Sequence, residues 1–460
     1  MWHFTNRLRL VICRGPGAMY RMLCSSSLFV CIHFLAGGQK PLSLQECVRI
    51  AFENRPDIQD AQLTLMYTKA QIKEGYSAYL PQVSASFTLD DNLKLLANVI
   101  PGGVLGPEPV VVRFGTTYAA FATGLAEQKI YDQSLITGFK AFKPSLEAAV
   151  ENIEKMRQEV AMEVATVYVQ AAVLTLQIEP LEEIRKEYKK LLSIVELQAK
   201  EGFALSTDVE RLRLALSNVE AQWQLLIVNR EMALQKLKAS MWVPETEPII
   251  PDTASIREMF RLQLTAPPFD PLRLPELRLL RKNIDIQKIQ MMRVKHGYIP
   301  NLSAYARYGV QALNNQFGPL WSRWFDFSSV GLRISFPVFD GFWRQSRYSQ
   351  ARIQWLQMQN QYKHSERLLK LQFENATLAR KQSAIDVLQQ EQTLQLARRV
   401  LLKSQAAFAE GRQALAEVLN AEIQFQQAMI NYHNALLMFL NAEIQLQKAA
   451  GRLLEYLKVR

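Results

Sequence analysis

Apolar residues recur three or four positions apart over two long stretches of the chain, residues 145–240 and 345–455, with polar and charged residues between them. Both stretches are rich in Ala, Leu, Gln, Glu, Lys and Arg and almost free of Gly and Pro. This spacing is typical of long helices that pack side by side in coiled coils. A glycine, Gly202 or Gly411, interrupts each stretch near its middle. We predict a turn between two antiparallel helices at each glycine.

Four shorter segments alternate apolar and polar residues with a period of two, which predicts β-strands with two unlike faces. They occur as two pairs, and each pair is predicted to form a hairpin, the first within residues 82–128 and the second within residues 301–339. A loop rich in Pro and Gly separates the strands of the first hairpin. The expected strands cover residues 83–89, 114–120, 302–310 and 330–338.

The two hairpins hold equivalent places in a duplicated chain. A helical stretch bounded by prolines precedes each hairpin, at residues 56–81 and 275–300, and a long helical stretch follows it. Between the halves, seven prolines mark a linker with one short helix near residues 256–262. The fold class is therefore mainly α with β-hairpins, in a duplicated helix–hairpin–helix arrangement. The expected segments are a first repeat at 39–243, the linker at 244–275 and a second repeat at 276–460.

The first 38 residues differ from the rest of the chain. They contain four arginines and no acidic residue, followed by an apolar run at 28–35 and then by Ala-Gly-Gly. This order is typical of a secretory signal peptide, which we place at residues 1–38, with Met19 as an alternative start. A single membrane anchor is the alternative, but the apolar run is much shorter than the ~20 residues that a spanning helix needs.

Cysteine usage and charge narrow the possible functions. Three of the four cysteines lie in the leader, so only Cys47 remains after cleavage and no internal disulfide framework can form. Without the four leader arginines, the formal charge falls from +11 to +7, and the basic residues are interleaved with acidic ones rather than clustered. We therefore expect no nucleic-acid partner.

Four strands in one chain cannot close a barrel, and open sheet edges are not tolerated in hydrocarbon, because each unpaired backbone group costs several kcal/mol there. Closure therefore needs other copies of the chain. Two copies supply eight strands, whose interior is filled by side chains, whereas three supply twelve, which can enclose a lumen. Aromatic residues flank both hairpins, as in interfacial girdles, although an ordinary sheet packed on helices also favours aromatic residues.

The chain resembles the outer-membrane efflux protein (TolC) family over essentially all of the expected mature protein. Residues 42–58, LSLQECVRIAFENRPDI, are similar to the N-terminal helix signature of that family, and the duplicated layout matches it. The resemblance implies a homotrimer with a 12-stranded outer-membrane β-barrel on a long periplasmic α-helical barrel. It also implies a passive exit duct of a tripartite efflux or type I secretion system, whose partners are a periplasmic adaptor protein, an inner-membrane pump and outer-membrane lipids.

The same resemblance assigns a docking role to the two predicted turns. In the family, the turns between the long helices meet the adaptor at the periplasmic end of the duct. The matching residues in this chain are Gly202 and Phe203 in the first repeat and Gly411 and Arg412 in the second.

The resemblance places a periplasmic gate and its selectivity filter just beyond these turns, at Asp208, Gln413, Glu417 and Asn420. Glu417 matches an acidic position, but Asn420 stands where an aspartate can occur, and Gln413 stands where an arginine can lock the closed gate. Arg412 is a neighbouring substitute for that arginine. Carboxylates that threefold symmetry brings together raise one another's pKa and attract cations. The alternative is that Asp208 and Glu417 are ordinary solvated helix charges.

Two other classes of protein compete with this hypothesis. An enzyme is disfavoured because the expected mature chain has only His296, His364 and His433, widely separated, with no paired metal-ligand spacing, nucleophile elbow or phosphate loop. We therefore expect no catalytic residue, metal site or cofactor. A periplasmic coiled-coil adaptor or scaffold would share the export signal and the paired long helices, but it would have no use for two alternating, aromatic-flanked hairpins in a duplicated chain.

Overall fold

Long helices make up most of the computed structural model, which describes residues 41–100, 107, 110–254, 256 and 268–459. The expected signal peptide at 1–38 and most of the expected short helix near 256–262 lie outside the described residues. The helical elements are α1 (Leu44–Asn54), α2 (Pro56–Ser77), α3 (Gln133–Phe139), α4 (Phe142–Lys200), α5 (Ser206–Met241), η1 (Pro271–Arg273), α7 (Pro275–His296), η2 (Gly318–Ser322), α8 (Trp343–Ala409), α9 (Leu415–Ala449) and α10 (Leu453–Tyr456).

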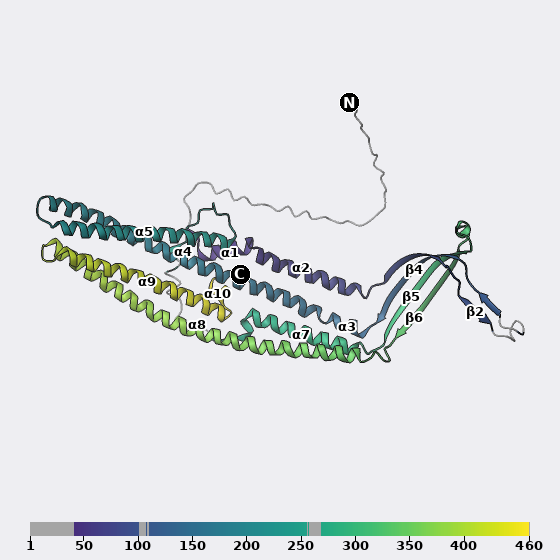
Figure 1. Cartoon of the computed structure of the whole chain (residues 1–460). Coiled ribbons are helices and arrows are strands. Elements are labelled where there is room, and N and C mark those ends of the chain that lie inside the picture. Colours follow the sequence, from purple (N-terminus) through teal and green to yellow (C-terminus); the bar gives the residue numbers. More distant parts are fainter. Residues whose placement is uncertain (1–40, 101–106, 108–109, 255, 257–267, 460) are drawn as a thin grey trace, which may run out of the picture. The chain divides into compact units, whose positions relative to one another are not determined.

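The two longest helices, α4 and α8, have 59 and 67 residues. At 1.5 Å per residue they extend roughly 90 Å and 100 Å. α4 packs along α5, and α8 packs along α9 (Figure 1). The turns predicted at Gly202 and Gly411 are confirmed, because each glycine lies between the two helices of such a pair and adopts a positive φ, +79° at Gly202 and +70° at Gly411.

Four strands, two from each repeat, form an antiparallel sheet in the order β1 (Gln82–Asp91), β4 (Tyr118–Tyr131), β5 (Asn301–Asn314) and β6 (Phe325–Ser335). The central pair β4–β5 joins the two hairpins, with Tyr118 opposite Asn314 at one end and Tyr131 opposite Leu302 at the other. Within the described residues, β1 and β6 each have a neighbouring strand on one side only. These two strands are therefore the open edges of the sheet.

The first hairpin differs from the expected one. Two additional strands, β2 (Ala97–Ile100) and β3 (Val110–Arg113), pair with each other in a separate ribbon. This ribbon is inserted between β1 and β4 in the sequence. β4 begins at Tyr118 rather than near residue 114, because Gly115 has a φ of +128°, which breaks the extended strand. The backbone N–H of Asn92 donates to the Thr117 carbonyl at 2.7 Å, next to the last β1–β4 pair, Asp91 and Tyr118.

The second hairpin also differs from the expected boundaries. β6 spans Phe325–Ser335 instead of residues 330–338. It ends before Pro337, which has no N–H to donate to a sheet ladder. β5 continues to Asn314, four residues beyond the expected end at residue 310.

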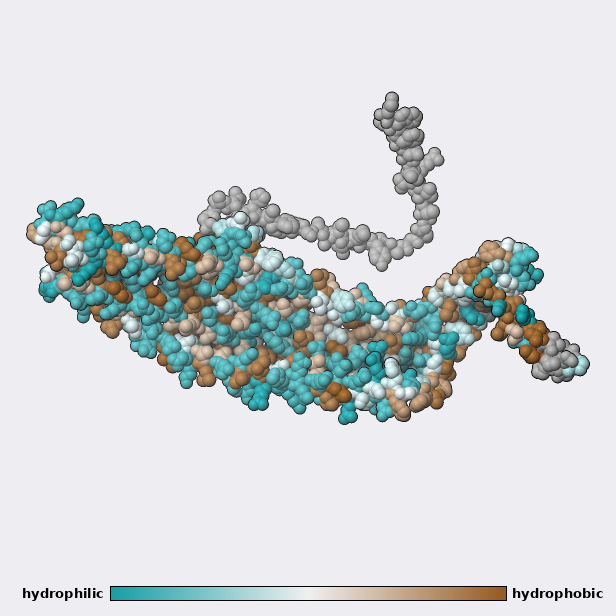
Figure 2. Space-filling view, viewed as in Figure 1, coloured by the Kyte–Doolittle hydropathy of each residue, from teal (hydrophilic) through white to brown (hydrophobic). Residues whose placement is uncertain are grey.

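The two faces of the sheet are unlike, as the alternation predicts. On one face, Val330, Leu332 and Ile334 of β6 are 85%, 69% and 66% exposed, and Val83, Phe87 and Leu89 of β1 share that face through the register. The opposite face carries Gln82, Ser84, Ser86, Thr88, Glu127, Arg307 and Arg333. Figure 2 shows apolar residues on the surface at the strand end of the chain. A sheet with one exposed apolar face needs an apolar environment around it.

The main hydrophobic core lies where α4 packs against α1, α5 and α9. Small residues of α4, among them Ala161, Ala165 and Ala172, are fully buried and allow this close approach. The helical segment Gln133–Lys200 is long and apolar enough to cross a membrane, but its apolar residues supply this core. The hydroxyl of Tyr168, also fully buried, lies 3.0 Å from the carbonyl oxygens of both Leu42 and Asp252. These contacts hold the N-terminal segment and the linker on α4.

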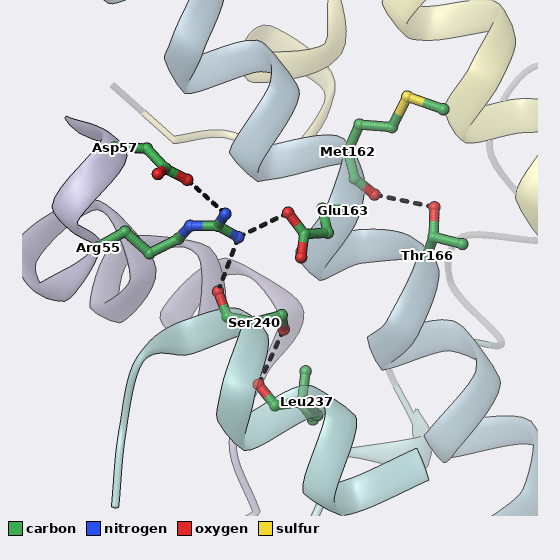
Figure 3. A network of polar contacts seen from close by, with 7 residues as sticks. All are labelled: Arg55, Asp57, Met162, Glu163, Thr166, Leu237 and Ser240. Atoms are coloured by element: carbon green, nitrogen blue, oxygen red, sulfur yellow. Dashed lines mark hydrogen bonds and ion pairs between the residues drawn. The ribbon is translucent and has the colours of Figure 1, made fainter. Parts of the chain in front are cut away.

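Arg55 ties together the start of the first repeat (Figure 3). It lies between α1 and α2, and its guanidinium donates to Asp57, to Glu163 of α4 and to the Ser240 carbonyl of α5. The Asp57 and Glu163 side chains are 44% and 51% exposed, so each ion pair alone adds little to stability. The network links the junction of α1 and α2 to α4 and α5.

Candidate functional site at the helix tips

The turn between α4 and α5 is closed by backbone hydrogen bonds. The N–H of Gly202 donates to the Ala199 carbonyl at 3.2 Å, and the N–H of Phe203 donates to the Gln198 carbonyl at 2.8 Å. This pair of bonds is the Schellman motif, which requires a left-handed residue at the position of Gly202. The turn therefore has a defined shape that the glycine makes possible.

The turn between α8 and α9 has the same geometry. The N–H of Gly411 donates to the Phe408 carbonyl at 2.9 Å, and the N–H of Arg412 donates to the Ala407 carbonyl at 2.8 Å. The two repeats thus present the same turn with different side chains, Phe203 in one and Arg412 in the other. Phe203 is 85% exposed, and the Arg412 side chain is 71% exposed. An exposed aromatic ring and an exposed guanidinium are typical anchors for a protein partner.

Asp208 and Glu417 occupy equivalent positions in the first turns of α5 and α9. The N–H of Asp208 donates to the Leu205 carbonyl at 3.0 Å, and the N–H of Glu417 donates to the Ala414 carbonyl at 3.1 Å. A carboxylate in the first turn is stabilised by the positive end of the helix dipole. Interaction with the helix dipole therefore explains an acidic residue at each position even if neither residue forms part of a gate. A role in gating would be additional.

The ion pairs at the tips are local ones. An Asp208 carboxylate oxygen lies 3.8 Å from a guanidinium nitrogen of Arg211, and Arg412 pairs with Glu410 of its own turn. In the described part of the chain, no ion pair joins Asp208 to Arg412. Arg211 lies three residues after Asp208 on the same helix face, a spacing that is visible in the sequence and favours an ion pair.

Asn420 lines a cavity of about 660 Å³ between α5 and α9. Arg211 and Tyr188 line the same cavity. The structure therefore brings the Asp208–Arg211 pair of the first repeat close to Asn420 of the second. Gln413 is half-buried in the α8–α9 turn, and Glu417 is exposed.

A carboxylate that sequence reasoning missed lies on α9 alongside this cavity and lines a different one, together with Glu187 and Tyr188 of α4. Glu422 of α9 is 5% exposed, and its Oε1 has no hydrogen-bond partner among the described residues. Burial, and secondarily the charge of Glu187 on α4, raise the pKa of Glu422 to about 7. The periodicity of α9 did not reveal this group. The sequence of one helix does not indicate which of its polar residues the neighbouring helices will bury.

The side chains at the helix tips can act through their charge, their shape and their packing between helices. Among the described residues there is no group of three or more His, Cys, Asp or Glu side chains that could hold a metal ion. The three histidines noted above lie on different helices, His296 at the end of α7, His364 in α8 and His433 in α9. The structure does not bring them together.

Known proteins resemble this chain over most of its length. The family described as "Outer membrane efflux protein" matches residues 48–241 and 272–452, one segment in each repeat. The alkaline protease secretion protein AprF of Pseudomonas aeruginosa is 21% identical over 396 residues, which cover 84% of this chain and 80% of AprF.

Solved outer-membrane channels have the same fold. The Campylobacter jejuni outer membrane channel CmeC superposes with a TM-score of 0.67 and 16% identity over 89% of this chain and 86% of CmeC. The open state of the Neisseria gonorrhoeae outer membrane channel MtrE superposes with a TM-score of 0.68 and 15% identity over 89% of each chain. The chain belongs to the outer membrane efflux protein family, whose members are exit ducts that reach from the outer membrane into the periplasm.

Proposed function

We propose that three copies of this chain form a passive exit duct, driven by an inner-membrane pump and reached through a periplasmic adaptor. The observation that supports this most directly is the four-stranded sheet with two open edges and one exposed apolar face. Open edges must be paired in hydrocarbon, and three sheets of four strands make a 12-stranded barrel with a lumen. The apolar face would contact lipid, and the polar face would contact water.

The helix tips would form the periplasmic entrance and the docking surface. The exposed side chains at the two Schellman turns, around Gly202 and Phe203 and around Gly411 and Arg412, suit contact with an adaptor. Asp208, Gln413, Glu417 and Asn420 would surround the entrance. Three copies of Glu417 near one axis would attract cations and repel anions.

A periplasmic adaptor or scaffold is the alternative function. It would explain the paired helices, but it would leave the exposed apolar face of β1 and β6 without a partner. AprF is named as a secretion protein, whereas CmeC and MtrE are named as outer membrane channels. We therefore infer that the chain is the exit duct of a tripartite efflux or type I secretion system. We also infer that the chain catalyses no reaction.

Cross-linking of the two sheet edges tests the assembly. Ser84→Cys on β1 is combined with Ser329→Cys or Ser335→Cys on β6, and the purified protein is oxidised. Native Cys47 is buried, which raises the pKa of its thiol to about 12 and keeps it unreactive. Closure of a barrel by three chains predicts covalent dimers and trimers and no larger species.

The control for this experiment combines Ser84→Cys with Ser303→Cys on the central strand β5, which cannot reach β1 of another copy in a closed barrel. Cross-linking in the control but not in the edge pairs would contradict the proposal. A ladder that continues beyond three chains would also contradict it.

The cation preference of the entrance is tested at Glu417. Glu417→Gln removes one carboxylate per chain, and we expect the K⁺-to-Cl⁻ permeability ratio of single channels to fall by about twofold or more, since fixed charges set the local ion concentration. Glu210→Gln is the matched control, because Glu210 is an exposed carboxylate of α5 near the same tip. An unchanged ratio in Glu417→Gln would assign the carboxylate to the helix surface alone.

A further inference from the structure

Three arginines of the second hairpin stack on aromatic rings. The guanidinium carbon of Arg307 lies 5.2 Å from the centre of the Phe327 ring, and that of Arg333 lies 5.2 Å from the centre of the Tyr305 ring. The guanidinium carbon of Arg323, which lies two residues before the start of β6, is 4.8 Å from the centre of the Phe325 ring. Such cation–π contacts hold a guanidinium in place without neutralising its charge.

The strand register places these pairs on one face. Arg307 is opposite Ser329, Arg333 is opposite Ser303, and Phe327 is opposite Gly309. These positions alternate with Leu302, Val330, Leu332 and Ile334, which lie on the apolar face. Arg307 and Arg333 therefore belong to the polar face of the sheet, as does Phe325, the ring on which Arg323 stacks.

Two glycines allow the rings to lie flat on the strands. A Cβ at Gly309 would lie 2.5 Å from the Phe327 ring, and a Cβ at Gly331 would lie 2.7 Å from the Tyr305 hydroxyl. Each ring thus covers the backbone of the neighbouring strand, and the arginine lies over the ring. The arrangement depends on glycine, aromatic and arginine residues at matched positions, so it is a built feature of the hairpin rather than a chance contact.

One acidic residue of the neighbouring strand, Glu127 of β4, lies on this face, opposite Tyr305. In the part of the chain that the structure describes, none of the three arginines takes part in an ion pair. Asp326, the acidic residue of β6, is opposite Val310 and lies on the apolar face. On the polar face, the first hairpin carries Asp90, Glu127 and Lys129, so its charges nearly balance. The second hairpin is therefore the cationic part of this face.

We infer that the stacked arginines form an anion-binding wall inside the barrel, selective for small organic anions such as carboxylates and sulfonates. The inference rests on the proposed function, in which the polar face lines the lumen. A guanidinium that is stacked on a ring still presents its N–H donors to an anion, and the adjoining ring offers a surface for an aromatic group. Three copies of the hairpin bring nine arginines to the wall, three from each chain.

The test compares ion selectivity and block in planar bilayers at about 0.1 M KCl, where charges are screened only beyond ~10 Å. We expect Arg307→Gln combined with Arg333→Gln to raise the K⁺-to-Cl⁻ permeability ratio by about twofold or more. Block of the wild-type current by 1-naphthalenesulfonate, added on the barrel side, should weaken by about tenfold in this variant, as expected when charge-assisted hydrogen bonds are lost.

Two control variants separate the anion wall from other effects of charge. Lys94→Gln removes an exposed positive charge between β1 and β2, outside the wall, and should change neither quantity. Arg307→Lys with Arg333→Lys keeps the charge, so it should keep the permeability ratio but weaken block by the aromatic anion. If channels of normal conductance form and the Gln variant matches Lys94→Gln, the anion wall is wrong although the duct stands. If wild-type trimers never conduct, the proposed function itself fails.

Discussion

At the scale of single residues, the tips hold a carboxylate that the fold keeps away from water. Glu422 is buried between α4 and α9, near Tyr188 and Glu187, and burial raises its pKa to about 7 from an ordinary 4.5. Burial, and secondarily the charge of Glu422, also raise the pKa of the Tyr188 hydroxyl. The packing of the tips is therefore coupled to protonation of Glu422 near neutral pH.

This coupling predicts a pH-dependent stability. Below pH 4.5, Glu422 is protonated in both the folded and the unfolded chain and costs nothing. Between pH 4.5 and about 7, the unfolded chain ionises first, so stability falls as pH rises, and above about 7 the cost is constant. Glu422→Gln should therefore raise stability at pH 8, by up to about 3 kcal/mol, and change it little at pH 4.

Thermal unfolding followed by circular dichroism at pH 4 and pH 8 measures this effect. Glu210→Gln serves as the control, since it removes an exposed carboxylate from the same end of the helices. If Glu422→Gln shifted the melting temperature equally at both pH values, Glu422 would not titrate in a buried state.

At the scale of elements, the two Schellman turns decide where the long helices reverse. Gly202 and Gly411 both have a positive φ, and nothing lies within 4 Å of a Cβ added at either position. Gly411→Ala should therefore destabilise the protein by about 1–2 kcal/mol through backbone strain alone, and Gly411→Asn should cost less, since Asn tolerates the left-handed region.

The same thermal measurement checks the turns. Gly318→Ala is the matched control, because that glycine also has open space around it but lacks a positive φ, so the substitution should be nearly neutral. A neutral Gly411→Ala would mean that the turn does not need its left-handed residue.

Sequence patterns predicted these elements unevenly, for physical reasons. The long helices and their turns depend on local spacing and on glycine, which are visible along the chain, and the structure agrees at Gly202 and Gly411. The β4–β5 pairing joins residues nearly two hundred positions apart, and no local signal encodes it. The β2–β3 ribbon was missed because its strands have only four residues each and flank a loop rich in Pro and Gly.

For the candidate site, the sequence predicted the positions of the residues but not the contacts between them. Similarity to the efflux family located Asp208, Gln413, Glu417 and Asn420 near the tips, but it did not reveal that Arg211 pairs with Asp208 and lines the cavity of Asn420. Nor did it reveal Glu422. Burial of a polar residue depends on which helices cover it, and this is a property of the packed structure.

At the scale of the whole molecule, a single chain leaves surfaces without a partner. Its sheet has two open edges, its apolar face is exposed, and its helix pairs end in exposed tips. Assembly with two further copies would satisfy the edges and would surround a path from the tips to the far end of the strands. The charges along that path differ, with carboxylates expected at the tips and stacked arginines expected in the barrel.

Planar-bilayer conductance of the detergent-purified protein, with its oligomeric mass determined in parallel, tests this account most directly. We predict a species of three chains that inserts into the bilayer and gives discrete conductance steps. A protein that stays soluble without detergent and never conducts would contradict the account and would favour a periplasmic adaptor or scaffold.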